Sequence, residues 1–332
     1  MAVVLTLYAA SAALAGSLTA PPGYVSIDTV LDLPPGAWFG GFDILPSGGF
    51  AISDGYGVHE IDPDGTLIRT LYTYPGYVYG SFVRYNAANG RVYFGESSQG
   101  TIRSVPLAGG EAALVATLAA NYDMDFSGGR PYVVAGNTVY TVDEATGETD
   151  AIATAGSVSG PLAFDVAGNL IYGTGNPNWP PTLNDQNIYL WTASQVAEAL
   201  GDTVLTADDA VVLAANVDAP SGFAFDGAGD LFYTDSQVSP GVIRMVRGGA
   251  ADVFAVTQAD GALPWTTTIR YNPSAGGVSA VVSWFDASWN THTVISTLVP
   301  APIPVPEPSS LVLLYLLIGL AGPAKLLRSC GR

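Results

Sequence analysis

The side chains that most often carry enzyme chemistry are scarce in this sequence. His59 and His292 are the only histidines, and each lies in an alternating polar and apolar segment that is typical of a β-strand. The single cysteine, Cys330, lies near the end of the chain, so the main domain can form neither a disulfide nor a thiol–metal site. The sequence contains no H-E-x-x-H motif, no G-x-S-x-G motif and no glycine-rich phosphate loop. It therefore offers no support for zinc proteolysis, α/β-hydrolase chemistry or nucleotide binding through these motifs.

Acidic residues gather in pairs where tight turns are expected. The pairs are Asp62 and Asp64, Asp123 and Asp125, Asp208 and Asp209, and Asp226 and Asp230. Calcium and other hard cations prefer several oxygen ligands of this kind. None of the pairs matches the twelve-residue calcium loop, however, and aspartate beside glycine is ordinary turn chemistry. The pattern favours turns, and a divalent cation such as Ca²⁺ stays an open alternative.

Two aromatic groups could bind a sugar by stacking. The ligand-binding candidates are Tyr74 and Tyr77, which lie in a tyrosine-rich stretch around Pro75-Gly76, and the pair Trp179 and Trp191. Tyrosines at alternate positions equally describe strands that pack into a core, and this interpretation is favoured for Tyr74 and Tyr77. Trp179 lies among prolines and asparagines, and for this residue both interpretations stay open.

The charge balance excludes one class of partner. The chain carries 29 acidic and 11 basic residues, for a formal net charge of −18. Such an acidic protein repels phosphate backbones, so nucleic acid is not an expected partner. Hydrophobic residues make up 48% of the chain, enough for a large core, and 39 glycines with 23 prolines indicate many turns.

Residues 1–20 are predicted to be a secretory signal peptide. Met1 to Ala15 is almost wholly apolar and small, and Ala13-Leu14-Ala15 offers an A-x-A cleavage site, with Leu18-Thr19-Ala20 as a second option. The run is too short to cross a membrane. No Lys or Arg precedes it, so either the amino terminus supplies the positive charge or the true start lies upstream.

The other end of the chain has the order of a spacer, an apolar segment and a basic finish. Residues 300–310 form a proline-rich spacer, which we expect to be stiff and extended. Residues 311–332 contain a short apolar helix followed by Lys325 and Arg328. Basic residues after an apolar segment stay cytoplasmic, so we expect the bulk of the chain to face outward.

The motif Pro306, Glu307 and Pro308, followed by this apolar helix and basic tail, resembles the PEP-CTERM sorting signal of Gram-negative bacteria. In that family an exosortase, a membrane transpeptidase, recognises the tail. The resemblance covers about the last 28 residues. It implies a protein that is transiently anchored in the inner membrane and then reaches the cell surface or the extracellular matrix. It also implies a setting of exopolysaccharide production.

A self-similar segment in the middle predicts the fold. Gly222 to Asp235 matches Pro161 to Thr174 and Gly41 to Asp54, each reading as strand, glycine turn, strand. Including three weaker copies, the second residues of the six copies are Phe42, Phe82, Asp123, Leu162, Phe223 and Thr268. Most steps are about 40 residues, the period of a propeller blade with four strands.

We therefore expect an all-β fold, a six-bladed β-propeller over residues 21–299. Tyr24 to Leu33 is expected to complete the last blade alongside His292 to Leu298. One step is longer by an insertion of about 20 residues, within which Ser194 to Leu200 is predicted to form a helix that Thr192 or Ser194 caps.

The repeated phrase x-F-D-x-x-G-N-L-x-Y resembles the NHL and gluconolactonase-like six-bladed propellers. Gluconolactonase-like relatives hold a divalent ion in the central channel through acidic and amide residues. By position in the repeat, this resemblance implies Asp54, Glu96, Asp123 and Asp235 as metal candidates, with Asn121 beside Asp123. No cofactor other than such a cation is expected.

Two functions are consistent with these observations. The first is an exported, surface- or matrix-associated propeller that acts as a non-enzymatic binding or structural protein, with polysaccharide or another envelope component as its partner. The alternative is a metal-dependent lactonase- or lyase-like enzyme. Three or more carboxylates or amides converging within about 3 Å of one point would favour the enzyme. A scattered or apolar channel lining would count against it.

Overall fold

The computed structural model describes residues 17–33, 39–156, 158–176, 182–201, 203–235, 240–258 and 262–301. The predicted signal peptide as far as residue 16, Trp179, the PEP motif, and the apolar segment with its basic tail lie outside the described residues. Among the described residues no helix is long and apolar enough to cross a membrane.

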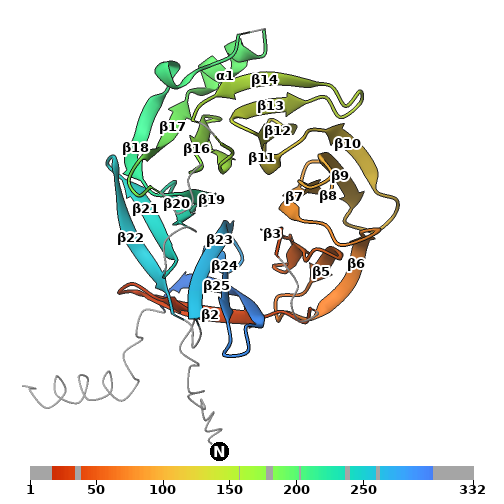
Figure 1. Cartoon of the computed structure of the whole chain (residues 1–332), viewed down its shortest axis with the longest axis vertical. Coiled ribbons are helices and arrows are strands. Elements are labelled where there is room, and N and C mark those ends of the chain that lie inside the picture. Colours follow the sequence, from red (N-terminus) through yellow and green to blue (C-terminus); the bar gives the residue numbers. More distant parts are fainter. Residues whose placement is uncertain are drawn as a thin grey trace, which may run out of the picture. The chain divides into compact units, whose positions relative to one another are not determined.

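The described strands form six antiparallel sheets, and these are arranged as the blades of a propeller (Figure 1). Blade 1 consists of β3 (Gly41–Ile44), β4 (Phe50–Ser53), β5 (Gly57–Ile61) and β6 (Leu67–Thr73), and blade 2 of β7 (Gly80–Asn86), β8 (Arg91–Glu96), β9 (Thr101–Pro106) and β10 (Ala113–Thr117). Blade 3 consists of β11 (Asn121–Ser127), β12 (Arg130–Ala135), β13 (Thr138–Val142) and β14 (Thr149–Thr154), and blade 4 of β15 (Leu162–Phe164), β16 (Leu170–Gly173), β17 (Gln186–Trp191) and β18 (Val211–Val217). Blade 5 consists of β19 (Pro220–Phe225), β20 (Leu231–Asp235), β21 (Val242–Arg247), β22 (Ala250–Thr257) and β1 (Leu18–Thr19), and blade 6 of β23 (Ala262–Asn272), β24 (Gly277–Phe285), β25 (Thr291–Pro300) and β2 (Tyr24–Val30).

The ring is closed by strands from both ends of the propeller sequence. β2 pairs with β25 from Tyr24 opposite Pro300 to Val30 opposite Val294, which confirms the expected closure of the last blade. β1 adds a fifth strand to blade 5, with Leu18 opposite Thr257. Residues 18–19 therefore belong to the propeller in this structure, although they fall within the segment predicted to be a signal peptide.

Apolar side chains fill the spaces between neighbouring blades. Phe42 and Ile52 of blade 1 meet Val281 and Ile295 of blade 6, and all four are at most 1% exposed. Because each sheet is covered on both faces, its strands can be apolar on both sides, which accounts for the high hydrophobic content. The apolar core is therefore distributed around the ring between the blades. The polar residues at the centre of the ring are not part of this core.

The insertion in blade 4 forms the expected helix. α1 (Ala193–Ala199) begins at the N-cap Thr192, whose side chain accepts from the backbone N–H of Gln195 in a capping box. Its buried residues Val196 and Ala199 pack between blades 3 and 4. A short 3₁₀ helix, Ala207–Asp209, follows before β18.

Candidate functional site

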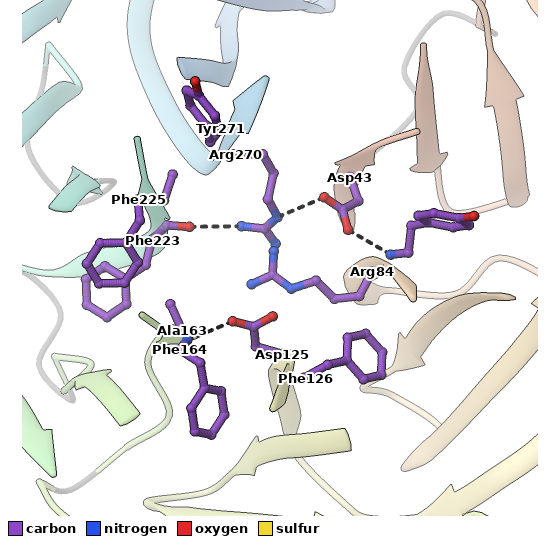
Figure 2. A pocket seen from close by; sticks show the side chains of 12 residues that line it. Asp43, Arg84, Asp125, Phe126, Ala163, Phe164, Phe223, Phe225, Arg270 and Tyr271 are labelled. Carbon is purple, nitrogen blue, oxygen red and sulfur yellow. Dashed lines mark hydrogen bonds and ion pairs between the residues drawn. The ribbon is translucent and has the colours of Figure 1, made fainter. Parts of the chain in front are cut away.

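One position on each innermost strand borders the channel. It is the residue that directly follows a buried apolar side chain, and in blades 1 to 6 it is Asp43, Arg84, Asp125, Ala163, Ala224 and Arg270. The two alanines also pack in the apolar clusters between blades 4 and 5 and between blades 5 and 6. All six line one cavity of about 240 Å³ (Figure 2). The four charged side chains lie on blades 6, 1, 2 and 3, which are consecutive around the ring, and the two alanines occupy blades 4 and 5. We call this the ring cavity.

The channel aspartates also join neighbouring blades. The innermost strand of a blade leaves N–H groups on its inner edge without a partner strand, and such groups need another acceptor. Asp43 accepts a hydrogen bond from the backbone N–H of Tyr85 in the next blade, at 2.7 Å. Asp125 accepts from Phe164 in the same way, at 2.8 Å. These carboxylates therefore position the strands from which the channel side chains project.

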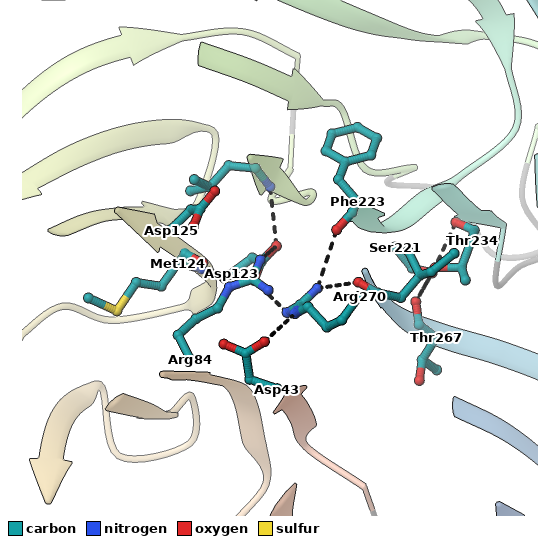
Figure 3. A network of polar contacts seen from close by, with 12 residues as sticks. Asp43, Arg84, Asp123, Met124, Asp125, Ser221, Phe223, Thr234, Thr267 and Arg270 are labelled. Carbon is teal, nitrogen blue, oxygen red and sulfur yellow. Dashed lines mark hydrogen bonds and ion pairs between the residues drawn. The ribbon is translucent and has the colours of Figure 1, made fainter. Parts of the chain in front are cut away.

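Two buried guanidinium groups lie between these carboxylates (Figure 3). Arg84 places Nη2 3.0 Å from Asp123 Oδ1 and donates through Nε to the carbonyl of Met124. Arg270 places Nη2 3.6 Å from the same Asp123 oxygen and Nε 3.8 Å from Asp43 Oδ1. Both arginine side chains are 6% exposed. Asp123 is thus held between two cations in the middle of the channel.

Burial changes the proton affinity of these acids. It raises the pKa of Asp123 to about 6, against the opposing pull of the Arg84 guanidinium. The pKa values of Asp43 and Asp125 are also raised by burial, and Arg84 again works in the opposite direction. Asp123 therefore takes up a proton under mildly acidic conditions.

A second cavity, of about 280 Å³, borders the channel. The first residues of β7 and β11 line it, among them Ser81 and Asn121, and so does Thr268 in the middle of β23, whereas later residues of these strands line the ring cavity. Arg270 borders both cavities. Hydroxyl and amide groups dominate the polar part of this second cavity, which we call the mouth cavity.

Three exposed tyrosines lead to the mouth cavity. Tyr56, Tyr77 and Tyr79 are 51%, 44% and 59% exposed. The ring centroids are 5.3 Å apart for Tyr56 and Tyr77 and 5.4 Å apart for Tyr77 and Tyr79, and both contacts are edge-to-face. Tyr79 also lines the mouth cavity, which places one end of the row at the channel. We call these three residues the tyrosine strip.

The aromatic residues that the sequence suggested as ligand-binding candidates differ in exposure in the structure. Tyr77 lies in the exposed strip, but Tyr74 is only 5% exposed, and its hydroxyl shares a hydrogen bond of 3.1 Å with that of Ser53. Trp191 is 0% exposed and donates through Nε1 to the carbonyl of Thr206 at 2.9 Å. Tyr74 and Trp191 are therefore core residues with little or no ring surface open to a sugar, as the packing interpretation favoured for Tyr74 predicts. Alternation along a strand does not by itself show which face is covered.

The predicted metal candidates do not form one ligand set. Three of them occupy equivalent ends of a second strand, where each is paired with a basic residue of its own blade: Asp54 with His59 (3.1 Å), Glu96 with Arg103 (3.1 Å) and Asp235 with Arg244 (3.7 Å). The fourth, Asp123, is paired with Arg84, and Asn121, two residues earlier, donates to the carbonyl of Leu118 at 2.9 Å. Across the described parts of the chain, no three His, Cys, Asp or Glu residues are grouped so that they could hold a metal ion.

Comparisons with known proteins find similarity in the fold but not in the sequence. No protein-family model and no curated protein matches the sequence. Virginiamycin B lyase from Staphylococcus aureus is similar in structure, with a TM-score of 0.53 and 12% identity over 83% of this chain and 99% of that one. A protein of unknown function from Bacteroides thetaiotaomicron gives 0.56 and 13% over 81% and 72%. The PQQ domain of pyranose dehydrogenase from Coprinopsis cinerea gives 0.58 and 8% over 84% and 97%. At these identities the similarity establishes the propeller fold alone.

Proposed function

We propose that this chain is an exported surface or matrix-associated propeller that binds a neutral polysaccharide and does not catalyse a reaction. The observation that carries the proposal is the tyrosine strip, three exposed aromatic rings in a row that ends at the mouth cavity. Export and handling by an exosortase are part of the proposal and rest on the predicted leader and the PEP-CTERM-like tail.

Carbohydrate fits the chemistry of this surface. Aromatic rings offer apolar faces to the C–H groups of a sugar, and hydroxyl and amide side chains can donate to and accept from its hydroxyls. The mouth cavity supplies such groups in Ser81, Asn121 and Thr268. Since the protein carries a formal net charge of −18, an acidic polysaccharide would be repelled, and a neutral one is favoured.

The alternative is a metal-dependent lactonase- or lyase-like enzyme, and virginiamycin B lyase shows that a protein of similar fold can be a lyase. The centre of the channel opposes this alternative, because Arg84 and Arg270 flank Asp123 and would repel a divalent cation. We expect Ca²⁺, Mg²⁺ and Mn²⁺ at micromolar concentration to leave the melting temperature unchanged. Saturable stabilisation by one of these ions would favour the enzyme instead.

A glycan panel tests the binding site. The full chain, kept soluble in mild detergent, is screened against neutral and acidic glycans together with Tyr77→Ala and Tyr79→Ala. Both substitutions should remove binding to neutral glycans, because each takes away one stacking face. Trp289→Ala is the matched control, since Trp289 is 68% exposed and lies in the β24–β25 turn of blade 6. The proposal fails if no glycan is bound, or if only the control substitution abolishes binding.

The amino terminus of the exported protein tests the leader. Ser17 donates to Asp28 Oδ2 through both its backbone N–H and its hydroxyl, each at 2.8 Å, and Leu18 pairs with Thr257. Cleavage after Ala20 would remove these contacts, whereas cleavage after Ala15 keeps them. Mass spectrometry of protein from the periplasm or medium should therefore find Gly16 as the first residue. A chain that retains Met1 would refute export through this leader.

A further inference from the structure

We infer that the ring cavity binds a small zwitterion, a molecule of about amino-acid size that carries both a carboxylate and an ammonium group. This site differs from the tyrosine strip in position and in ligand chemistry, so it extends the proposed function and does not depend on it. The inference rests on the shape of the cavity, on one unpaired buried donor and on the order of charges around the ring.

The shape of the cavity follows from the side chains at the six ring positions. Long charged side chains occupy blades 6, 1, 2 and 3, but Ala163 and Ala224 occupy blades 4 and 5. Each alanine is 5% exposed and packs in an apolar cluster between blades, and its short side chain lines the ring cavity beside Phe164, Phe223 and Phe225. The resulting volume of about 240 Å³ is below the ~300 Å³ at which sites for drug-sized ligands begin. It suits a correspondingly small molecule.

The charged half of the ring contains a donor that the protein does not satisfy. Arg270 is 5% exposed, and its Nε has no hydrogen-bond partner among the described residues. The nearest carboxylate oxygen, Asp43 Oδ1, is 3.8 Å away, which is too far for a hydrogen bond. A buried donor without a partner is costly, so an acceptor supplied by a ligand would be stabilising. A carboxylate gives the strongest such acceptor for a guanidinium group.

The ring also contains acids that would gain from a cation. Asp43 and Asp125 lie on either side of Arg84 in the order of blades, and each uses Oδ2 to accept from the backbone of the next blade. Burial raises the pKa of both, which shows that nearby positive charge does not fully offset their desolvation. An ammonium group in the ring cavity would compensate these carboxylates directly.

The alternation of charge decides between ligand classes. Around the ring the order is cation, anion, cation, anion, from Arg270 through Asp43 and Arg84 to Asp125. A ligand with a carboxylate alone would face the two aspartates, and one with an ammonium alone would face the two arginines. Asp123, which lies between the two guanidinium groups, is not among the residues that line the ring cavity. A molecule with both groups places its carboxylate beside the Nε of Arg270 and its ammonium beside Asp43 and Asp125, with its apolar part against the two alanines.

Calorimetric titration of the full chain with free α-amino acids tests the inference. The informative probes are one bound amino acid, its N-acetyl derivative, which lacks the ammonium charge, and its methyl ester, which lacks the carboxylate. Each derivative should bind roughly tenfold more weakly or worse, because it leaves a buried charge unpaired. The inference is overturned if no amino acid binds, or if either derivative binds as tightly as the parent compound.

Two substitutions fill the cavity without changing its charges. Ala163→Leu and Ala224→Leu should each abolish the rise in melting temperature that the bound amino acid produces. Ala145→Leu, at an exposed alanine in the β13–β14 turn, should retain that rise. Glycan binding by the tyrosine strip should persist in both cavity variants, which separates failure of this site from failure of the proposed function. If Ala163→Leu and Ala224→Leu fold and are still stabilised by the amino acid, the site is contradicted. If these variants do not fold, the titrations with the N-acetyl derivative and the methyl ester decide the question.

Discussion

Replacing Arg84 with methionine is expected to destabilise the propeller strongly at pH 8 and much less at pH 5. The Arg84 side chain is 6% exposed and lies 3.0 Å from Asp123, which is itself buried. Methionine preserves most of the aliphatic volume but removes the charge. In the variant, Asp123 keeps the backbone N–H groups of Met124 and Leu162 at 2.9 and 3.2 Å, but its nearest remaining guanidinium is that of Arg270, at 3.6 Å.

The magnitude follows from leaving a buried carboxylate poorly paired. Removing one partner of a buried ion pair costs about 3–5 kcal/mol, because the remaining charge stays desolvated. Burial raises the pKa of Asp123 to about 6 in the folded protein, above the value of about 3.9 in an unfolded chain. A raised pKa contributes stability that is complete below the unfolded value and is lost as the pH rises through the folded value. At pH 5 Asp123 is mostly protonated, so the cost of losing Arg84 should fall to roughly 2 kcal/mol or less.

Urea denaturation at both pH values provides the measurement. The matched control is Arg247→Met, because Arg247 is 64% exposed in a 2.6 Å pair with Asp230, and a surface pair contributes about 0–1 kcal/mol. A loss below about 1 kcal/mol in Arg84→Met at pH 8 would refute the reasoning, since it lies below the range for a broken buried pair. Equal losses at pH 8 and pH 5 would refute the role assigned to Asp123 protonation.

Two further predictions concern backbone geometry and a second buried acid. In Gly65→Ala the new Cβ would lie 1.9 Å from the carbonyl oxygen of Val30 at a φ of +93°, so the melting temperature should fall far more than in Gly90→Ala. Gly90 also has a positive φ, +68°, but no atom within 4 Å of an added Cβ, and equal losses would contradict the steric argument. Burial, with the neighbouring charge of Asp218, raises the pKa of Asp235 to about 7. Its contribution to stability is therefore lost as the pH rises through 7, and Asp235→Asn should show a shallower decline in unfolding free energy between pH 5 and pH 8. A wild-type slope would contradict this.

The repeat in the sequence predicted the ring because each blade is a local unit. Four strands joined by short turns need about 40 residues, so the unit leaves a period that can be seen along the chain. The six anchor residues of the copies fall on the six innermost strands, β3, β7, β11, β15, β19 and β23. The closing strand β2 was also predicted, since a propeller with unpaired end strands would leave an exposed edge.

The channel network was missed for a physical reason. Arg84 and Arg270 each follow a buried apolar residue on an innermost strand, the same offset at which Asp43 and Asp125 occur. A charged residue at the same position of several innermost strands was therefore the sequence signal that could have indicated the network. The sequence did not reveal which of these residues contact one another, because the contacts join different blades and the paired residues are distant in sequence.

The same limit explains the metal candidates. The repeat correctly placed Asp54 and Glu96 at equivalent positions, but it could not show whether their partners lie across the channel or on the next strand. The short turn after β4 brings His59 to Asp54, and the turn after β8 brings Arg103 to Glu96. Because each of these acids is already paired with a basic residue of its own blade, it does not join the other acids in a shared ligand set in the channel.

The pairing of β2 with β25 has a consequence for the order of folding. Tyr24 is among the first described residues to be synthesised, and its partner Pro300 is among the last. Blades 1 to 5 can form their hairpins as they are synthesised, but the ring stays open until β25 has been made. Contacts of such high sequence separation form slowly, so closure is expected to be the final folding step. A chain cut short before β25 would therefore retain an unpaired β2, an edge that favours aggregation or degradation.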